Sequence, residues 1–180
     1  MGLEALLKEH REVILEGWFA RIIGTYPDVT SRFLAKQKDR FQNPVGYAIT
    51  QSIGPIYDQV ASAMDTDQLL EALDGIVRIR SVQDFTPTEA IGFVFQLKAV
   101  IRREIGDRVR ELERWDDLAE LESRVDRVAL LAFEKYTECR ENLHQVRNRE
   151  VENRAARVLG RVKAGSANSQ HEEEPIDDDV

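Results

Sequence analysis

The chain has 180 residues, of which 42% are hydrophobic and 32% charged, so it holds enough apolar material for one domain of ordinary size. Its formal net charge of −8 is unevenly spread: six of the 33 acidic residues lie in the last nine positions, which leaves 27 acids against 25 bases elsewhere. Nucleic-acid binding relies on clustered Lys and Arg, so this balance predicts no nucleic-acid partner.

Cysteine use and the N-terminus indicate where the protein works. Cys139 is the only cysteine, which excludes an intramolecular disulfide and favours the reducing cytoplasm. Charged residues are spread among the leucines of residues 1–10, so this segment is not a signal peptide. Apolar runs stay well short of the roughly 18 residues of a membrane span, and we expect no direct membrane insertion.

Apolar residues at helical spacing predict helices in the first third of the chain. One amphipathic helix is expected over residues 3–24 and a short second helix over about 28–38, with Phe33 and Leu34 facing inward. Asn43 and Pro44 form a favoured helix start. Pro55 lies inside the helix that follows, so a kink or two shorter helices are expected there.

The next two helix starts carry capping signals. Asp65 with Gln68 resembles a capping box, and Thr86-Pro87-Thr88-Glu89 combines a capping threonine, a proline in the first turn and a returning glutamate. Apolar residues at helical spacing follow both starts. The chain is therefore predicted to be all-α.

A long helix is predicted from about Trp115, because no proline follows until Pro175 and no glycine until Gly160. One helix of roughly 45 residues would be about 70 Å long, more than a compact domain of this size can cover. Its second half is expected to protrude, pair with another chain or fray. We predict a homodimer through this helix, with candidate interface residues Val125, Val128, Ala132, Val146, Val151 and Ala155.

The composition changes after the long helix. Residues 164–180 are polar and acidic and lack the apolar surface needed to offset the entropy of ordering. We therefore predict a helical domain over 1–163 and a disordered acidic tail over 164–180.

Histidine and cysteine positions give no sign of catalytic or metal chemistry. His10, His144 and His171 each lie among charged residues without a second ligand at metal-binding spacing, and solvated or capping roles are favoured over ligation. Cys139 lies on the apolar line of the long helix, where a buried hydrophobic role is favoured over that of a nucleophile. No catalytic, cofactor-binding or metal-binding residue is predicted, and the protein is expected not to be an enzyme.

Two groups of charged residues have alternative interpretations. Arg78 and Arg80 precede Asp84 and either contact an anion or partner, or are helix-end charges paired with nearby acids; the second interpretation is favoured. Acidic residues also crowd the start of the long helix, where they complement the helix dipole without a metal. They are Glu111, Glu113, Asp116, Asp117 and Glu120.

Two stretches together identify a family resemblance: FQNPVG (41–46), and IVRIRSVQDFTPTEA (76–90) running on to FQLK (95–98). With the leading amphipathic helix, they resemble the N-terminal domain of RsbR-type stressosome co-antagonists of the RsbRD-like variety, over about residues 3–136. The resemblance implies a globin-like helical fold without haem, a homodimer and a sensory role. Residues 73–85, where the haem-side helix is expected, contain no axial ligand.

In full-length relatives of this family, a long final helix leads into a C-terminal STAS domain that meets a switch kinase. Only the polar acidic tail follows Val162 here, so we expect no STAS domain. The favoured hypothesis is a non-enzymatic homodimeric signalling or regulatory module that couples an unidentified cue to an unidentified protein partner. The alternatives are an accessory or assembly subunit of a larger redox or membrane-associated complex, and a small-ligand binding protein with an apolar pocket between helices.

Overall fold

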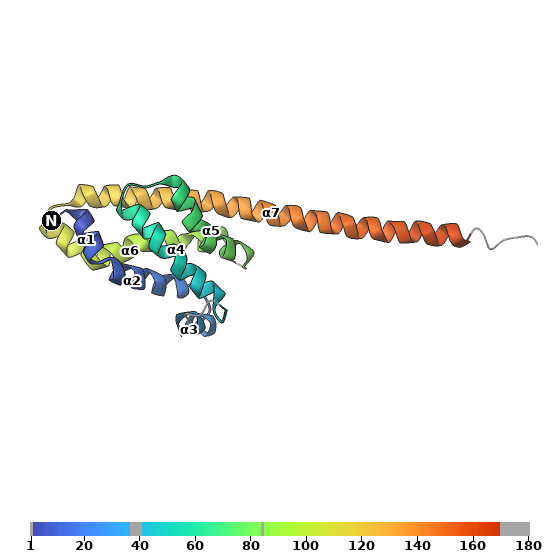
Figure 1. Ribbon diagram of the computed structural model, residues 1–180, viewed down its shortest axis with the longest axis horizontal. Helices are drawn as coiled ribbons and strands as arrows, with labels where there is room; N and C mark the ends of the chain where they lie inside the picture. The colour runs from blue at the N-terminus through green and yellow to red at the C-terminus, as the bar shows by residue number, and fades with distance from the viewer. Residues whose placement is uncertain (1, 37–40, 84, 170–180) are drawn as a thin grey trace, which may run out of the picture. The chain divides into compact units, whose positions relative to one another are not determined.

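The computed structural model describes residues 2–36, 41–83 and 85–169, with the side chains of all but 36, 158 and 160–169 (Figure 1). Helices and no strand occur within these ranges, which confirms the all-α prediction. No described helix is both long and apolar enough to span a membrane. The helices are α1 (Leu3–Glu9), α2 (Arg11–Ile23), α3 (Asp28–Lys36), α4 (Pro44–Ala61), α5 (Thr66–Val82), α6 (Pro87–Glu111) and α7 (Trp115–Ser169).

The chain divides into two units, residues 1–140 and residues 141–180. The first unit, here called the body, contains α1 to α6 and the first part of α7, and it holds the hydrophobic core. In the second unit, the described side chains are exposed except for the half-buried Leu143.

The predicted helix over 3–24 is wrong, because the structure has two helices that meet at His10. The hydroxyl of Tyr57 in α4 donates a hydrogen bond of 2.8 Å to the carbonyl oxygen of Leu7. In a continuous helix this carbonyl would accept from the amide of Arg11. A tertiary contact thus occupies a helix acceptor where α1 ends.

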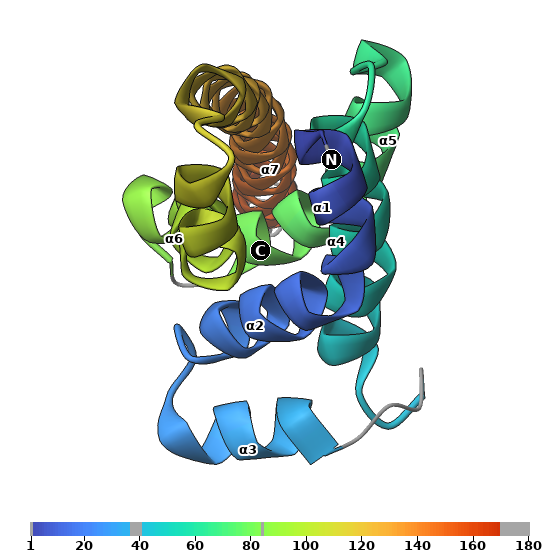
Figure 2. The same ribbon diagram turned by 90° about the vertical axis from the view of Figure 1, so that its left-hand side faces the viewer.

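Helix α2 lies between α3 and α6 and also contacts α4 (Figure 2). Its side chains Ile14, Trp18 and Ile22 are fully buried. The indole Nε1 of Trp18 donates to the carbonyl oxygen of Phe93 in α6 at 2.7 Å, which satisfies the polar atom of this large core residue.

The start of α4 confirms the predicted Asn43 cap. Its side-chain oxygen accepts from the amide of Gly46 at 2.8 Å, while its Nδ2 donates to the carbonyl of Leu34 in α3 at 3.0 Å. A Cβ at position 46 would lie 2.2 Å from that Nδ2, so the cap requires glycine there. Leu34 is buried as expected, but Phe33 is half exposed, and its predicted inward position is wrong.

The remaining predicted helix starts behave similarly. Asp65 accepts from the amides of Asp67 and Gln68, and Thr86 with Glu89 forms a complete capping box. Pro55 lies inside α4, which is assigned as one helix rather than two.

Helix α7 has 55 residues and extends to Ser169, nine residues beyond the end expected near Gly160. The first part of α7, which belongs to the body, forms polar contacts with α5. Lys135 pairs with Asp74 of α5 at 3.0 Å, and Arg140 donates to the carbonyl of Ser81 at 3.1 Å. Residues 164–169 of the predicted tail belong to α7, and residues 170–180 lie outside the described residues, so the predicted disorder of the acidic tail stays a prediction.

Candidate functional site

The predicted interface residues of α7 divide into two groups. Val125, Val128 and Ala132 are fully buried in the body, together with Leu121 and Tyr136 on the same helical line. The core of their own chain covers these side chains, so in this conformation they offer no surface to a second chain.

The other three candidates, Val146, Val151 and Ala155, belong to the second unit and are exposed. Val151, for example, has an exposed fraction of 66%. A helix gains most of its stability from packing of an apolar face. These three residues therefore remain candidates for contact with another chain.

Two ion pairs define how α6 and α7 align in the body. Lys98 lies 2.6 Å from Asp126, and Arg102 forms a two-pronged ion pair with Glu122. From Lys98 to Arg102 the chain advances along α6, while the partners of these residues run backward along α7, from Asp126 to Glu122. The two helices are therefore antiparallel. The guanidinium of Arg102 donates from both Nε and Nη2, a geometry that fixes orientation as well as charge.

An apolar patch continues the same two helical lines. One turn before Lys98 on α6 lies Phe95, and one turn after Asp126 on α7 lies Leu130, followed by Phe133. Their exposed fractions are 48%, 71% and 53%. We call these three residues the α6–α7 patch. Large apolar side chains here take the positions that charged pairs occupy farther along the helices.

The sequence carried a signal for this patch that the interface prediction missed. Leu130 and Phe133 lie off the buried line of α7 formed by Val125, Val128 and Ala132. A helix with one apolar line needs only one covering surface, whereas two lines indicate a second contact. The pairing with Phe95 becomes visible only with the α6–α7 register.

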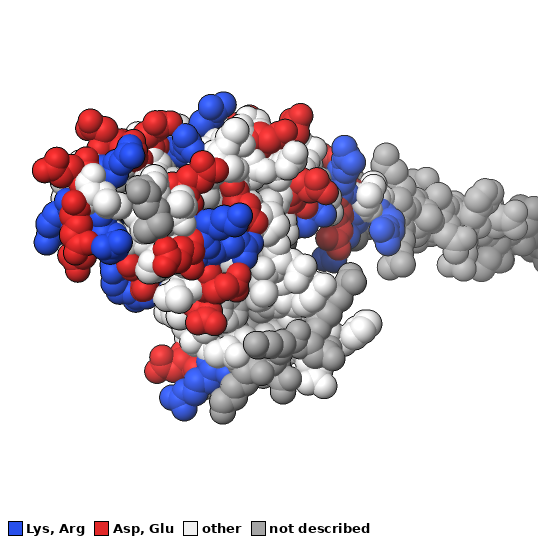
Figure 3. Space-filling model, turned by 60° about the vertical axis from the view of Figure 1, so that its left-hand side comes forward, with Lys and Arg blue, Asp and Glu red and all other residues white. Residues whose placement is uncertain are grey.

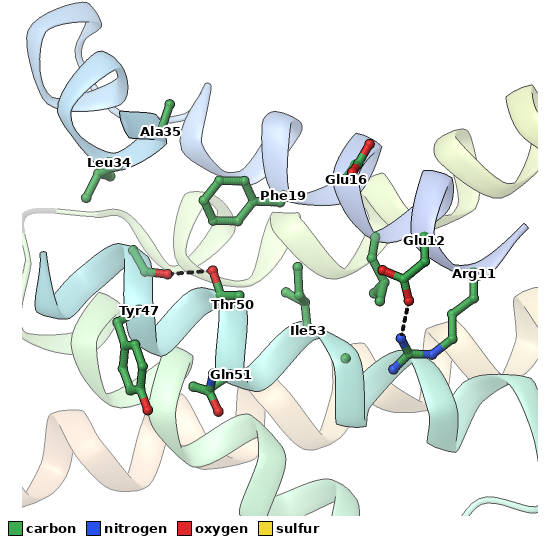
Figure 4. A pocket seen from close by; sticks show the side chains of 13 residues that line it. Arg11, Glu12, Glu16, Phe19, Leu34, Ala35, Tyr47, Thr50, Gln51 and Ile53 are labelled. Carbon is green, nitrogen blue, oxygen red and sulfur yellow. Dashed lines mark hydrogen bonds and ion pairs between the residues drawn. The ribbon is translucent and has the colours of Figure 1, made fainter. Parts of the chain in front are cut away.

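A pocket of about 500 Å³ lies in the body between α2, α3 and α4 (Figure 4). Phe19 from α2 and Ile53 from α4 extend into it. At one end, the guanidinium of Arg11 donates to both carboxylate oxygens of Asp58 at 2.8 Å. It also donates to one carboxylate oxygen of Glu12 at 2.9 Å. The volume of the pocket falls in the range of small-molecule sites, about 300–1,000 Å³.

Arg80 corrects the favoured interpretation of the two arginines, because it is a fully buried residue rather than a helix-end surface charge. Its guanidinium donates to the carbonyls of Glu89 (2.9 Å) and Ile22 (3.3 Å) and to the hydroxyl of Thr25 (2.7 Å). Burial lowers the pKa of this guanidinium. Arg78 is exposed and lies 3.6 Å from Asp74, as the helix-end interpretation predicted.

Aromatic rings surround the Arg80 guanidinium. The ring centres of Phe85, Tyr26 and Phe93 lie 4.7, 5.3 and 5.4 Å from its central carbon. Cation–π attraction is strongest where the cation is removed from water. Arg80 thus joins the end of α2 to α5 and to the start of α6, and its role is structural.

The described histidines, the cysteine and the acidic residues form no metal site. No group of three or more His, Cys, Asp or Glu side chains that could hold a metal ion occurs among the described residues. His144 is exposed, His10 lies at the α1–α2 junction, and His171 is outside the described residues. Cys139 is a half-buried free thiol.

Positive and negative side chains are intermixed over the face of the body in Figure 3.

Three of the acidic residues around the start of α7, Glu111, Asp117 and Glu120, pair with arginines. Asp117 pairs with Arg114 at 3.1 Å, and Glu120 pairs with Arg124 at 2.7 Å. Arg124 also donates to the carbonyl of Ser62 at 2.7 Å, which connects α7 to the end of α4. These carboxylates therefore form local ion pairs with arginines three or four residues away.

The fold defines an all-α domain that ends in one long helix. The chain belongs to the family of the RsbT co-antagonist protein RsbRD N-terminal domain, whose model matches residues 12–151. This range includes α2 to α6 and the part of α7 that carries Leu130 and Phe133, and it confirms the family predicted from the sequence. Comparison with curated proteins and with solved structures found no significant match.

Proposed function

We propose that this protein is a non-enzymatic, homodimeric signalling module of the stress response, which couples a cue to a protein partner in the cytoplasm. The observation that carries the proposal is the family match over residues 12–151. The description of the family as an RsbT co-antagonist indicates a role in regulating another protein. A globin-like arrangement of the helices, without haem, is part of the proposal.

The homodimer rests on two exposed apolar surfaces, one in each unit. In the body, the α6–α7 patch presents Phe95, Leu130 and Phe133, beside the ion pair of Lys98 and Asp126. Aromatic and aliphatic anchors next to a polar rim are typical of protein interfaces. In the second unit, Val146, Val151 and Ala155 supply the second surface. In a two-fold symmetric dimer, each of these surfaces would be covered by the same surface of the second chain.

The partner is tested by tagging the chain in its native host and identifying the proteins that co-purify. A switch kinase or STAS-domain proteins are expected. Oxidoreductase subunits would instead favour the accessory role in a larger complex and would contradict the signalling proposal.

A variant with glutamates at Leu130 and Phe133 provides the matched comparison. If the dimer presents the partner-binding surface, this variant should recover less of the same kinase or STAS proteins while keeping its helical circular dichroism. A control with glutamates at Val13 and Val29, which are exposed apolar residues of α2 and α3, should recover them normally.

A further inference from the structure

We propose that the pocket between α2, α3 and α4 binds a small amphipathic molecule with an apolar body and either no charge or one positive charge. Three helices form its walls, with Leu15 and Phe19 from α2, Leu34 from α3, and Thr50 and Ile53 from α4 (Figure 4). A role of this molecule as the cue rests on the proposed function, whereas its binding does not.

Two faces of α2 explain why a pocket exists at this position. Ile14, Trp18 and Ile22 face the core and are fully buried. Leu15 and Phe19, one residue farther along the helix in each turn, are half buried and line the pocket. Helix α3 lies over this second face but contributes only one fully buried side chain among those described, Leu34. Apolar surface of α2 and α4 is thus left for a ligand to cover.

Small residues keep the pocket open. Ala35 of α3 and Gly46 and Gly54 of α4 line it. Gly46 is required by the Asn43 cap, and a Cβ at Gly54 would lie 3.4 Å from Nη2 of Arg11. Gly54 therefore lies directly against the Arg11 side chain, which reaches Asp58 along the end of the pocket.

The charges of the lining decide the class of ligand. Among the lining residues that the structure describes, Arg11 is the one cation, and Asp58 and Glu12 already occupy its guanidinium. Hydrogen bonding to Asp58 raises the pKa of Arg11, so its charge is firmly held in this pair. Glu16, also in the lining, is exposed and forms no ion pair with any described residue. Within the described lining, an anionic ligand would meet the Glu16 carboxylate and an Arg11 already paired with two carboxylates, an arrangement that favours a neutral or cationic ligand.

Polar groups in the lining can orient such a ligand. The hydroxyl of Thr50 donates to the carbonyl of Gly46 at 2.9 Å and keeps its acceptor capacity. The amide of Gln51 supplies both donors and an acceptor beside it. A few polar groups around an apolar volume are the usual composition of a small-molecule site.

The test uses two fluorescent probes with the same aromatic scaffold, the neutral N-phenyl-1-naphthylamine and the anionic 1-anilinonaphthalene-8-sulfonate. The neutral probe should bind saturably with one site per chain and more tightly than the anionic probe. Absence of saturable binding, or tighter binding of the anionic probe, would overturn the proposal. Light scattering on the same samples reports the oligomeric state, so failure of binding and failure of the homodimer are separate results.

Matched substitutions locate the binding. Ala35→Phe fills the pocket from an exposed position of α3, and Ala20→Phe makes the same change at an exposed position of α2 outside the lining. The first should weaken the neutral probe by at least about tenfold and the second by less than about twofold. Thr50→Trp fills the pocket from the opposite wall and should match Ala35→Phe. Equal weakening by Ala20→Phe and the two pocket variants would contradict binding at this site.

Charge reversal gives an independent readout. Glu16→Lys should strengthen the anionic probe several-fold, whereas Glu4→Lys, at an exposed position of α1, should leave it unchanged. Identical effects of both changes would show that the anionic probe responds to net charge rather than to the pocket, and would contradict the assignment of the ligand class.

Discussion

The two parts of α7 use the same kind of sequence in different ways. Up to Arg140, an apolar line that includes Val125 and Val128 is buried in the body. Beyond Glu141, apolar residues continue at helical spacing, yet Val146 and Val151 are exposed. Helical periodicity therefore predicts an apolar line but not the surface that covers it.

The largest effect should come from placing a charge on each side of this division. Val125→Asp buries an unpaired carboxylate and should cost about 4 kcal/mol or more of folding free energy. Val151→Asp, the same change at an exposed position, should leave the protein folded. Urea denaturation followed by circular dichroism distinguishes them, and a stable Val125→Asp variant would show that the first part of α7 is not core.

The second-largest effect should come from removing the buried guanidinium of Arg80 from the body. Arg80→Leu removes the hydrogen bonds that the buried guanidinium donates to Glu89, Ile22 and Thr25, and should cost about 3 kcal/mol. Arg78→Leu removes an exposed arginine 3.6 Å from Asp74 and should cost less than about 0.5 kcal/mol. Urea midpoints of both variants check this, and similar losses would contradict a structural role for the buried guanidinium.

The third prediction concerns the exposed surface of α7 in the body. Leu130→Glu combined with Phe133→Glu should weaken self-association by at least about a hundredfold, because apolar anchors are replaced by charges that a two-fold axis brings together. The body should remain folded, since both side chains are largely exposed. Analytical ultracentrifugation measures the change, with Val13→Glu and Val29→Glu as the control pair. Equal weakening in the control would place the interface elsewhere.

The smallest effect should come from the cap of α6. Thr86→Ala removes the side chain that accepts from the amide of Glu89 and should cost about 1 kcal/mol. Hydrogen bonds from the amide and hydroxyl of Thr86 lower the pKa of Glu89 below its usual 4.5.

The pH dependence of this cap has a definite sign. A lowered pKa in the folded state means that the Glu89 contribution is complete above pH 4.5 and is lost as the pH falls through the folded value. Thermal melting of wild type and Glu89→Ala should therefore differ at neutral pH and converge on acidification. A difference that grows in acid would contradict the capping role.

Local signals were enough to predict much of this fold. The caps at Asn43, Asp65 and Thr86 involve residues within three positions of one another, so their geometry follows from the sequence. The break at His10 could not be predicted in this way. It coincides with a hydrogen bond from Tyr57, which is 50 residues from its acceptor Leu7.

The candidate sites depend still more on long-range contacts. The neighbours of Arg80 in the sequence do not indicate its burial, which follows from the rings of Tyr26, Phe85 and Phe93 in three separate segments. To predict the α6–α7 patch, one must know the register of two helices, and to predict the pocket, one must know how three helices are arranged. The apolar line of α7 was predictable, whereas the division between its buried and exposed parts required the extent of the body.

The most direct test of the homodimer is the mass of the wild-type chain in solution. Multi-angle light scattering at micromolar concentration should give twice the 20.6 kDa of one chain. A mass of one chain under these conditions would contradict the account, because the α6–α7 patch and the exposed valines of the second unit would then have no second copy to cover them.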